Sequence, residues 1–208
     1  MNRTDFGLCM IITRPKLSYA DVARSCVKCG VTYLQLREKD LSDREILAAA
    51  AEVLSVTRGT ETKFVVNDRA DLALLAGADM LHLGQGDVTL SDARRIVKDM
   101  PIGLSTHSLD QAREALAQSP NYIGFGPIYP TTTKAIADPT VGTELLGEVL
   151  KFADVPVIAI GGIFPENVET VTSAGARNIC LVRHLMECDT REELERRILE
   201  LQAALKNN

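Results

Sequence analysis

The 208-residue sequence contains no apolar run long enough to span a bilayer. Its first residues, MNRTD, are followed by a short apolar segment rather than by the longer core of a signal peptide. We therefore expect a cytoplasmic protein that uses no membrane partner. Acidic residues outnumber basic ones, and the formal net charge of −5 argues against general nucleic-acid binding. A basic site in this chain should therefore be local and suited to a small anion.

The cysteines form no disulfide or zinc pattern. Five is an odd number, and without a secretory context it indicates reduced thiols. Cys26 and Cys29 have C-x-x-C spacing, but no second Cys or His pair stands at a distance that would complete a zinc site. We therefore interpret both as thiols of one helix.

Short apolar runs alternate with helical patterns along the whole chain. Expected strands cover residues 6–12, 33–37, 63–67, 80–83, 102–105, 122–125, 157–160 and 179–182. Expected helices cover residues 17–29, 42–57, 69–75, 90–98, 109–117, 143–152, 166–174 and 191–205. Eight such units predict a single α/β domain over residues 1–208, a (β/α)8 TIM barrel with its active site at the C-terminal ends of the strands. A doubly wound open sheet is the rival, but no G-x-G-x-x-G follows the first strand.

The segment GFGPIYPTTTK at 124–134 has the composition of an anion-binding loop. An apolar strand meets a Gly-Pro break there, and hydroxyl groups then precede a lysine. Thr131, Thr133 and Lys134 together with accessible backbone N–H groups suit a phosphate ester or a diphosphate. The alternative is a solvated threonine-rich loop.

Charged side chains follow three of the expected strands. The period of two places Gln35, Arg37 and Lys39 on one face, where they bind an anion or form a structural ion-pair layer. Asp68 and Asp87 follow neighbouring strands, so both carboxylates could approach one hard cation, with Mg2+ the natural candidate. Asp68 could instead cap a helix, and Asp87 could hold a turn.

The later strands end in neutral donors. Ser105 and His107 invite a nucleophile interpretation, but no nucleophile elbow surrounds the serine, so we expect Ser105 to be a hydrogen-bonding lining group. His82 lies inside an apolar strand and is expected to be a core residue with satisfied hydrogen bonds. Gly161 and Gly162 precede Pro165, which we expect in the first turn of a helix whose N–H groups bind phosphate.

The candidates sort into two anion sites. One combines Arg37, Lys39, Asn67 and Lys134 with a metal, and suits a diphosphate. The other combines Thr131, Thr133, Gly162 and the end of strand eight, and suits a phosphate monoester. This arrangement suggests the joining of two phosphorylated small molecules with loss of diphosphate.

Six segments carry the motifs of a known family in family order. They read QLREK (35–39), VNDRADLAL (66–74), HLGQGD (82–87), GLSTH (103–107), GFGPIYPTTTK (124–134) and AIGGI (159–163). The chain thus resembles the thiamine-phosphate synthase family, also called thiamine-phosphate pyrophosphorylase. The resemblance implies a transferase that condenses hydroxymethylpyrimidine diphosphate with thiazole phosphate, by a dissociative mechanism that uses Mg2+, to give thiamine phosphate and diphosphate.

The resemblance also implies residue roles. The pyrimidine diphosphate would contact Gln35, Arg37, Lys39, Asn67, Ser105 and Lys134, of which Arg37, Lys39, Ser105 and Lys134 form the catalytic set. The metal ligands would be Asp68 and Asp87. The thiazole phosphate would contact Thr131, Thr133, Gly162 and the backbone near Val182 and Arg183. Two positions depart from the family: Arg183 stands where many relatives have serine, and Gly86 stands where an acidic residue is frequent.

Two other functions stay open at this point. A related thiazole tautomerase would share the barrel and the thiazole-phosphate site and could use His107 as a base. A non-catalytic binding protein would keep the phosphate cradle without turnover. Apolar helix faces allow a homo-oligomer, although no stretch identifies an interface.

Overall fold

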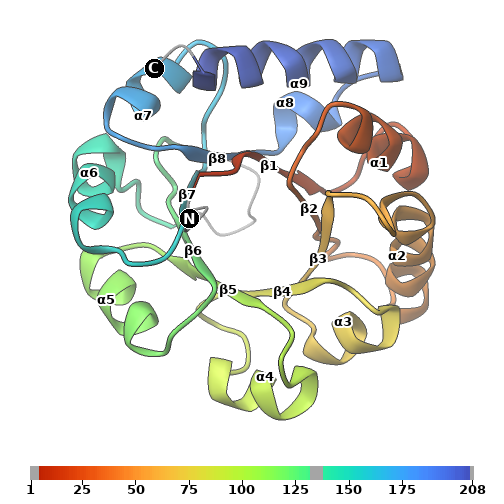
Figure 1. The fold of residues 1–208 in the computed structure, drawn as a ribbon, viewed down its shortest axis with the longest axis horizontal. Helices are drawn as coiled ribbons and strands as arrows, with labels where there is room; N and C mark the ends of the chain where they lie inside the picture. Colours follow the sequence, from red (N-terminus) through yellow and green to blue (C-terminus); the bar gives the residue numbers. More distant parts are fainter. Residues whose placement is uncertain (1–4, 132–137, 207–208) are drawn as a thin grey trace.

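The computed structural model describes residues 5–131 and 138–206, and eight parallel strands in them close into a barrel inside a ring of helices (Figure 1). The strands are β1 (Gly7–Ile12), β2 (Tyr33–Leu36), β3 (Lys63–Asn67), β4 (Met80–Leu83), β5 (Ile102–Thr106), β6 (Tyr122–Phe125), β7 (Val157–Ile160) and β8 (Asn178–Leu181). The helices are α1 (Tyr19–Lys28), α2 (Asp43–Thr57), α3 (Ala70–Ala76), α4 (Leu90–Val97), α5 (Leu109–Ala117), α6 (Gly142–Phe152), α7 (Val168–Ser173), α8 (Arg183–Met186) and α9 (Arg191–Lys206). The predicted (β/α)8 fold is confirmed.

Local sequence explains where several helices begin and end. Ser42 and Glu45 form a reciprocal capping box at the start of α2, which satisfies two backbone N–H groups that the helix leaves without partners. Thr89 and Ser108 are the N-cap residues of α4 and α5, and the side-chain oxygen of each accepts a hydrogen bond from one backbone N–H of the first helical turn. Gly77 ends α3 with φ of 72°, a left-handed conformation that glycine adopts without strain.

Two expectations near the C-terminus were wrong. Pro165 does not occupy the first turn of a helix, because α7 begins only at Val168 and residues 165–167 form a turn. The eighth strand ends at Leu181 rather than at Val182, and the short helix α8 begins at Arg183. Four residues are too few to show helical periodicity, so the sequence pattern did not reveal α8.

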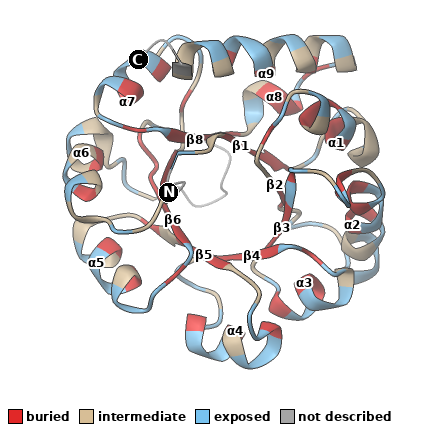
Figure 2. Cartoon of the chain, viewed as in Figure 1, coloured by how far each residue is buried: buried red, intermediate tan, exposed pale blue. Residues whose placement is uncertain are grey.

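Buried residues lie along the strands and on parts of the surrounding helices (Figure 2), and they form two separate clusters. The larger core joins the outward faces of the strands to the inward faces of the helices. The smaller core lies inside the barrel, because all of its buried members belong to strands: Cys9, Ile11, Val65, Met80, Tyr122, Ile158 and Cys180. Tyr122 is accommodated by Gly103, where a Cβ would lie 2.1 Å from the phenol Cζ atom. All five cysteines are free thiols.

Polar contacts close the barrel between its first and last strands. The buried Asn178 at the start of β8 accepts hydrogen bonds from the backbone N–H groups of Phe6 (2.8 Å) and Gly7 (3.2 Å). Its amide nitrogen donates to the carbonyl of Val157 at 3.3 Å. One side chain therefore links β1, β7 and β8.

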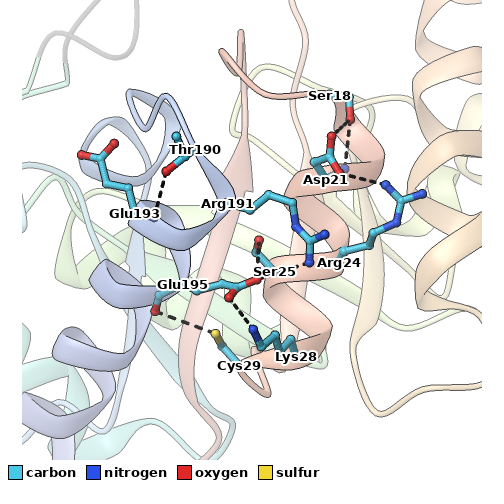
Figure 3. A network of polar contacts seen from close by, with 10 residues as sticks. All are labelled: Ser18, Asp21, Arg24, Ser25, Lys28, Cys29, Thr190, Arg191, Glu193 and Glu195. Carbon is cyan, nitrogen blue, oxygen red and sulfur yellow. Dashed lines mark hydrogen bonds and ion pairs between the residues drawn. The ribbon is translucent and has the colours of Figure 1, made fainter.

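The last helix, α9, contacts α1 through polar side chains (Figure 3). Glu195 of α9 accepts from Lys28 of α1 at 2.7 Å and from Arg191 at 3.3 Å. Arg197 pairs with Glu193 at 2.6 Å and donates to the backbone carbonyl of His184 in α8. These contacts hold α1 and α8 against α9. No helix within the described ranges is both long and apolar enough to cross a membrane.

Candidate active site

A cavity of about 830 Å3, including its open mouth, lies at the C-terminal ends of the strands. Six of the predicted site residues line it: Arg37, Ser105, Thr131, Gly162, Val182 and Arg183. A smaller space of about 410 Å3 continues below it into the barrel, where Gln35 is buried. Ser105 lines both spaces, so the two are adjacent. Thr133 and Lys134 lie outside the described residues.

Two carboxyl groups meet beside the mouth of the barrel. The Asp68 N–H donates to the His82 carbonyl at 2.7 Å, and Asp87 accepts from the Gly84 N–H at 2.6 Å. Burial raises the pKa of Asp68, but its hydrogen bond with Asp87 and the Lys39 ammonium outweigh burial and lower it. Burial and the same hydrogen bond raise the pKa of Asp87. Asp87 is therefore the carboxyl of the pair that takes up a proton first as the pH falls.

The sequence allowed two structural roles as alternatives to metal binding, a turn for Asp87 and a helix cap for Asp68. Asp87 does hold a turn, through its bond to Gly84, and it also faces Asp68. Asp68 does not cap α3, because Arg69 is the N-cap residue and no side chain caps this helix. Asp68 instead has φ of 65°, a left-handed conformation in which Asp and Asn are the most frequent residues after glycine.

Cationic groups border the carboxyl pair. The Lys39 ammonium contacts the Asp68 carboxylate. In this structure Lys39 therefore forms an ion pair, which was the alternative to its binding an anion. The Arg37 guanidinium also acts on Asp68 and lines the cavity. Asn67 ends β3 and pairs with His82 of β4. The structure thus brings two cations and two carboxyls together. Of these four groups Arg37 lines the cavity, whereas Lys39, Asp68 and Asp87 are not among the described residues that form its wall.

The carboxyl pair has the donor set of a magnesium site rather than of a closed zinc site. No group of three or more His, Cys, Asp or Glu side chains occurs in residues 5–131 and 138–206 in an arrangement that could hold a metal. Mg2+ is commonly held by one or two carboxylates, with water and substrate phosphates as its other ligands. Asp68 and Asp87 fit this requirement.

Backbone groups form the opposite wall of the cavity. Gly161 and Gly162 have φ of 96° and 65°, and the Gly162 carbonyl accepts from the Asn167 amide at 2.8 Å. The Asn167 side-chain Oδ1 accepts from the Phe164 N–H at 2.8 Å, so the Asn167 side chain bonds to the loop at two points. Asn167 was not among the predicted site residues, although Asn is a common bridging residue in turns. No side chain caps α8, whose N-terminus lies beside Val182 in the cavity wall.

The two histidines near Ser105 have different surroundings. His82 is buried, and its ring nitrogens hydrogen bond to Tyr122 Oη and Ser105 Oγ, which confirms it as a satisfied core residue. His107 instead hydrogen bonds to the Gly126 carbonyl, and its Nε2 lies 3.5 Å from Asp138 Oδ2. The Ser105 hydroxyl bonds to His82, so the structure does not support a Ser105–His107 nucleophile pair.

Replacement of Gly162 by alanine is expected to lower the free energy of unfolding by about 2–3 kcal/mol. A Cβ there would lie 2.7 Å from the Tyr129 carbonyl oxygen and 2.8 Å from that of Pro130, in addition to the strain of positive φ. Gly142→Ala is the matched control, because its φ of 76° carries the same strain with nothing within 4 Å. Urea unfolding measures both variants. Equal losses would contradict a close approach at Gly162.

Comparison with known proteins gives one consistent result. A sequence model of a family described as thiamine monophosphate synthase matches residues 9–185. A thiamine-phosphate synthase of Syntrophomonas wolfei is 35% identical over 205 residues, 97% of this chain and 98% of that protein. One of Halalkalibacterium halodurans is 39% identical over 174 residues, 83% of this chain and 82% of the relative. The solved thiamine phosphate pyrophosphorylase of Pyrococcus furiosus superposes with a TM-score of 0.86 at 29% identity, covering 99% and 98% of the two chains.

Proposed function

The chain belongs to the thiamine monophosphate synthase family, and we propose that it condenses hydroxymethylpyrimidine diphosphate with thiazole phosphate to give thiamine phosphate and diphosphate. One observation carries the proposal. A single cavity has the Arg37 guanidinium in one part of its wall, and the backbone of Gly162 and the start of α8 in another. Arg37 also acts on the Asp68 carboxylate, which is not among the described residues that line the cavity. Such a cavity suits two different phosphorylated molecules that must react with each other.

The charged side is assigned to the pyrimidine diphosphate. Its proposed contacts are Gln35, Arg37, Lys39, Asn67, Ser105 and Lys134, with Asp68 and Asp87 as the residues that would hold Mg2+. Support comes from the position of Arg37 and Ser105 in the cavity wall and from the Lys39 ammonium at Asp68. A diphosphate carries enough charge to compete for both cations.

The backbone side is assigned to the thiazole phosphate. Its proposed contacts are Thr131, Thr133, Gly162, Val182 and Arg183. A phosphate site formed by the loops after strands seven and eight and by a short extra helix is common in barrels of this type. Here α8 is that helix, and Arg183 at its first position is exposed, so its side chain can reach the solvent-facing oxygens of a phosphate.

The proposed reaction is dissociative. The C–O bond to the diphosphate breaks first, the amino-pyrimidine stabilises the resulting methylene cation, and the thiazole nitrogen then forms the new C–N bond. Arg37, Lys39 and Lys134 would neutralise the departing oxygens, which is where charge develops. Mg2+ bound at Asp68 and Asp87 would supply further neutralisation of the diphosphate. No protein base is needed, because the attacking nitrogen has a free electron pair and neither bond change moves a proton.

Product formation tests the proposal directly. The purified chain is incubated with both substrates and Mg2+, and thiamine phosphate is measured by mass spectrometry beside a sample without metal. We expect product only with metal. Binding of both ligands without product would overturn the synthase assignment in favour of a binding protein, and proton exchange on the thiazole alone would favour a tautomerase. The free thiols support a further proposal, that the enzyme acts in the cytoplasm.

Lys134→Ala is expected to slow diphosphate departure by about a hundredfold, because a cation at the leaving group is lost. The single-turnover rate at saturating substrate is the informative quantity, since it excludes binding and product release. Lys151→Ala is the control, because Lys151 lies in the last turn of α6 and is exposed. An unchanged single-turnover rate in Lys134→Ala would rule out this role.

A further inference from the structure

A chain of hydrogen bonds runs through the barrel interior beneath the cavity. Tyr122 Oη lies 2.9 Å from His82 Nδ1, and His82 Nε2 lies 2.8 Å from Ser105 Oγ. The Gln35 side chain also hydrogen bonds to the Tyr122 phenol. Tyr122 and His82 are 2% and 8% exposed, whereas Ser105 lines the cavity. The chain therefore connects the closed interior of the barrel to the place where substrate binds.

Packing fixes the position of the phenol in this chain. The Tyr122 ring fills the space above Gly103, where even a Cβ atom would lie 2.1 Å from it. The Tyr33 ring packs against it with centroids 5.7 Å apart, and the His82 ring stacks on it at 5.5 Å. The phenol oxygen cannot leave His82 without repacking of the interior. What the packing leaves open is which partner donates the proton in the Tyr122–His82 and His82–Ser105 hydrogen bonds.

Two directions are possible for a neutral imidazole, which has one donor and one acceptor nitrogen. In the outward direction, Tyr122 donates to Nδ1 of His82, and Nε2–H donates to Ser105. The serine proton is then left to point into the cavity. In the inward direction, Ser105 donates to His82, and only its lone pairs face the substrate.

The chemistry of the groups favours the outward direction. A phenol is more acidic than an aliphatic alcohol and is the stronger donor, and its oxygen is the poorer acceptor because its electrons delocalise into the ring. Burial raises the pKa of Tyr122 well above its usual range, so the phenol keeps the proton that it must donate. An amide N–H of Gln35 donated to the phenol oxygen would leave the phenol proton for His82.

We propose that Tyr122 and His82 are positioning residues that hold the Ser105 hydroxyl as a hydrogen-bond donor toward the pyrimidine substrate. This inference rests on the proposed function, which places the pyrimidine against Ser105. A fixed donor selects a ring nitrogen with a free lone pair and disfavours an analogue with a C–H group at that position, because the hydroxyl would lose its partner. The relay would therefore contribute to the choice of substrate without contacting it.

The first test reads the tautomer of His82 in the ligand-free, full-length protein. Nitrogen NMR at mildly alkaline pH distinguishes a protonated from a bare ring nitrogen, and the His82 signals are assigned by their loss in His82→Gln. We expect a proton on Nε2 and none on Nδ1. Tyr122→Phe keeps the ring that fills the barrel and removes only the donor, so it should reduce this preference. A bare Nε2 in the unmodified protein would overturn the proposal.

The second test separates positioning from structure. Tyr122→Phe is expected to raise the KM for the pyrimidine diphosphate about tenfold, the order of one lost hydrogen bond, with little change in the KM for thiazole phosphate. In a Ser105→Ala background, the same substitution should have no further effect, because the hydroxyl that it orients is gone. An equal loss in both backgrounds would contradict the relay.

Tyr33→Phe is the matched control for the second test. It removes a phenol oxygen from the same layer, and within the described part of the chain Tyr33 makes no hydrogen bond to His82. We expect its KM values to match those of the unmodified protein. If the unmodified protein forms no thiamine phosphate, the proposed function fails, while the tautomer of His82 still decides the relay.

Discussion

Replacing Asp68 with asparagine is expected to raise the Mg2+ concentration needed for half-maximal turnover by about a hundredfold, and to leave little activity at limiting metal. Lys39 and the hydrogen bond with Asp87 lower the pKa of Asp68, so this carboxyl stays ionised to a lower pH than Asp87, and its replacement removes negative charge from the proposed metal site. Asparagine is a better choice than alanine because residue 68 has φ of 65°, which Asn tolerates and Ala does not. Activity titrated against Mg2+ at saturating substrates measures the shift.

The matched control for this experiment is Asp71→Asn. Asp71 lies nearby, in the first turn of α3, but it pairs with Arg69 at 2.6 Å and is exposed. We expect its metal titration to match that of the unmodified protein. A titration of Asp68→Asn that coincides with the control would remove Asp68 from the proposed metal site, whatever its effect on stability.

Arg37→Ala is expected to lower the single-turnover rate by about a hundredfold to a thousandfold, the usual loss when one preorganised donor to a developing charge is removed. The Arg37 backbone N–H donates to the Ile12 carbonyl at 2.9 Å, so the residue is held at the junction of β1 and β2 while its side chain lines the cavity. Rapid-quench measurement at saturating pyrimidine diphosphate and thiazole phosphate gives the rate of the chemical step.

Lysine at position 37 distinguishes charge from geometry. Arg37→Lys restores the positive charge but not the planar pair of N–H groups that binds two oxygens at once, so we expect only partial recovery. Arg95→Ala is the control for general charge loss, because Arg95 lies on α4 and its side chain is 82% exposed. A rate in Arg37→Ala equal to that of the control would exclude Arg37 from leaving-group stabilisation.

The sequence predicted the barrel because its signals are local and repeated. Each strand is a short apolar run, and every predicted strand limit agrees with the structure to within one residue. The charged candidates were found for a related reason. Residues that follow parallel strands emerge at one edge, so Arg37, Asp68 and Asp87 meet regardless of the helices between them.

The missed features depend on contacts that a sequence pattern does not contain. The helix α8 is too short for periodicity and is held by Arg197 of α9, a long-range contact. Asn167 has a role only because the loop after β7 returns its backbone to the side-chain amide. The buried bond between His82 and Tyr122 joins residues 40 positions apart, so no local spacing predicts it.

The seam at Asn178 has a consequence for how the chain folds. Its hydrogen bonds to Phe6 and Gly7 span 172 and 171 positions, so the first strand keeps one edge unpaired until β8 has been synthesised. Contacts of such sequence separation slow folding, because a large loop must close before they form. During translation, the growing sheet therefore exposes two edges that could pair with other chains. That period ends only when β8 pairs with β1 and α9 docks on α1.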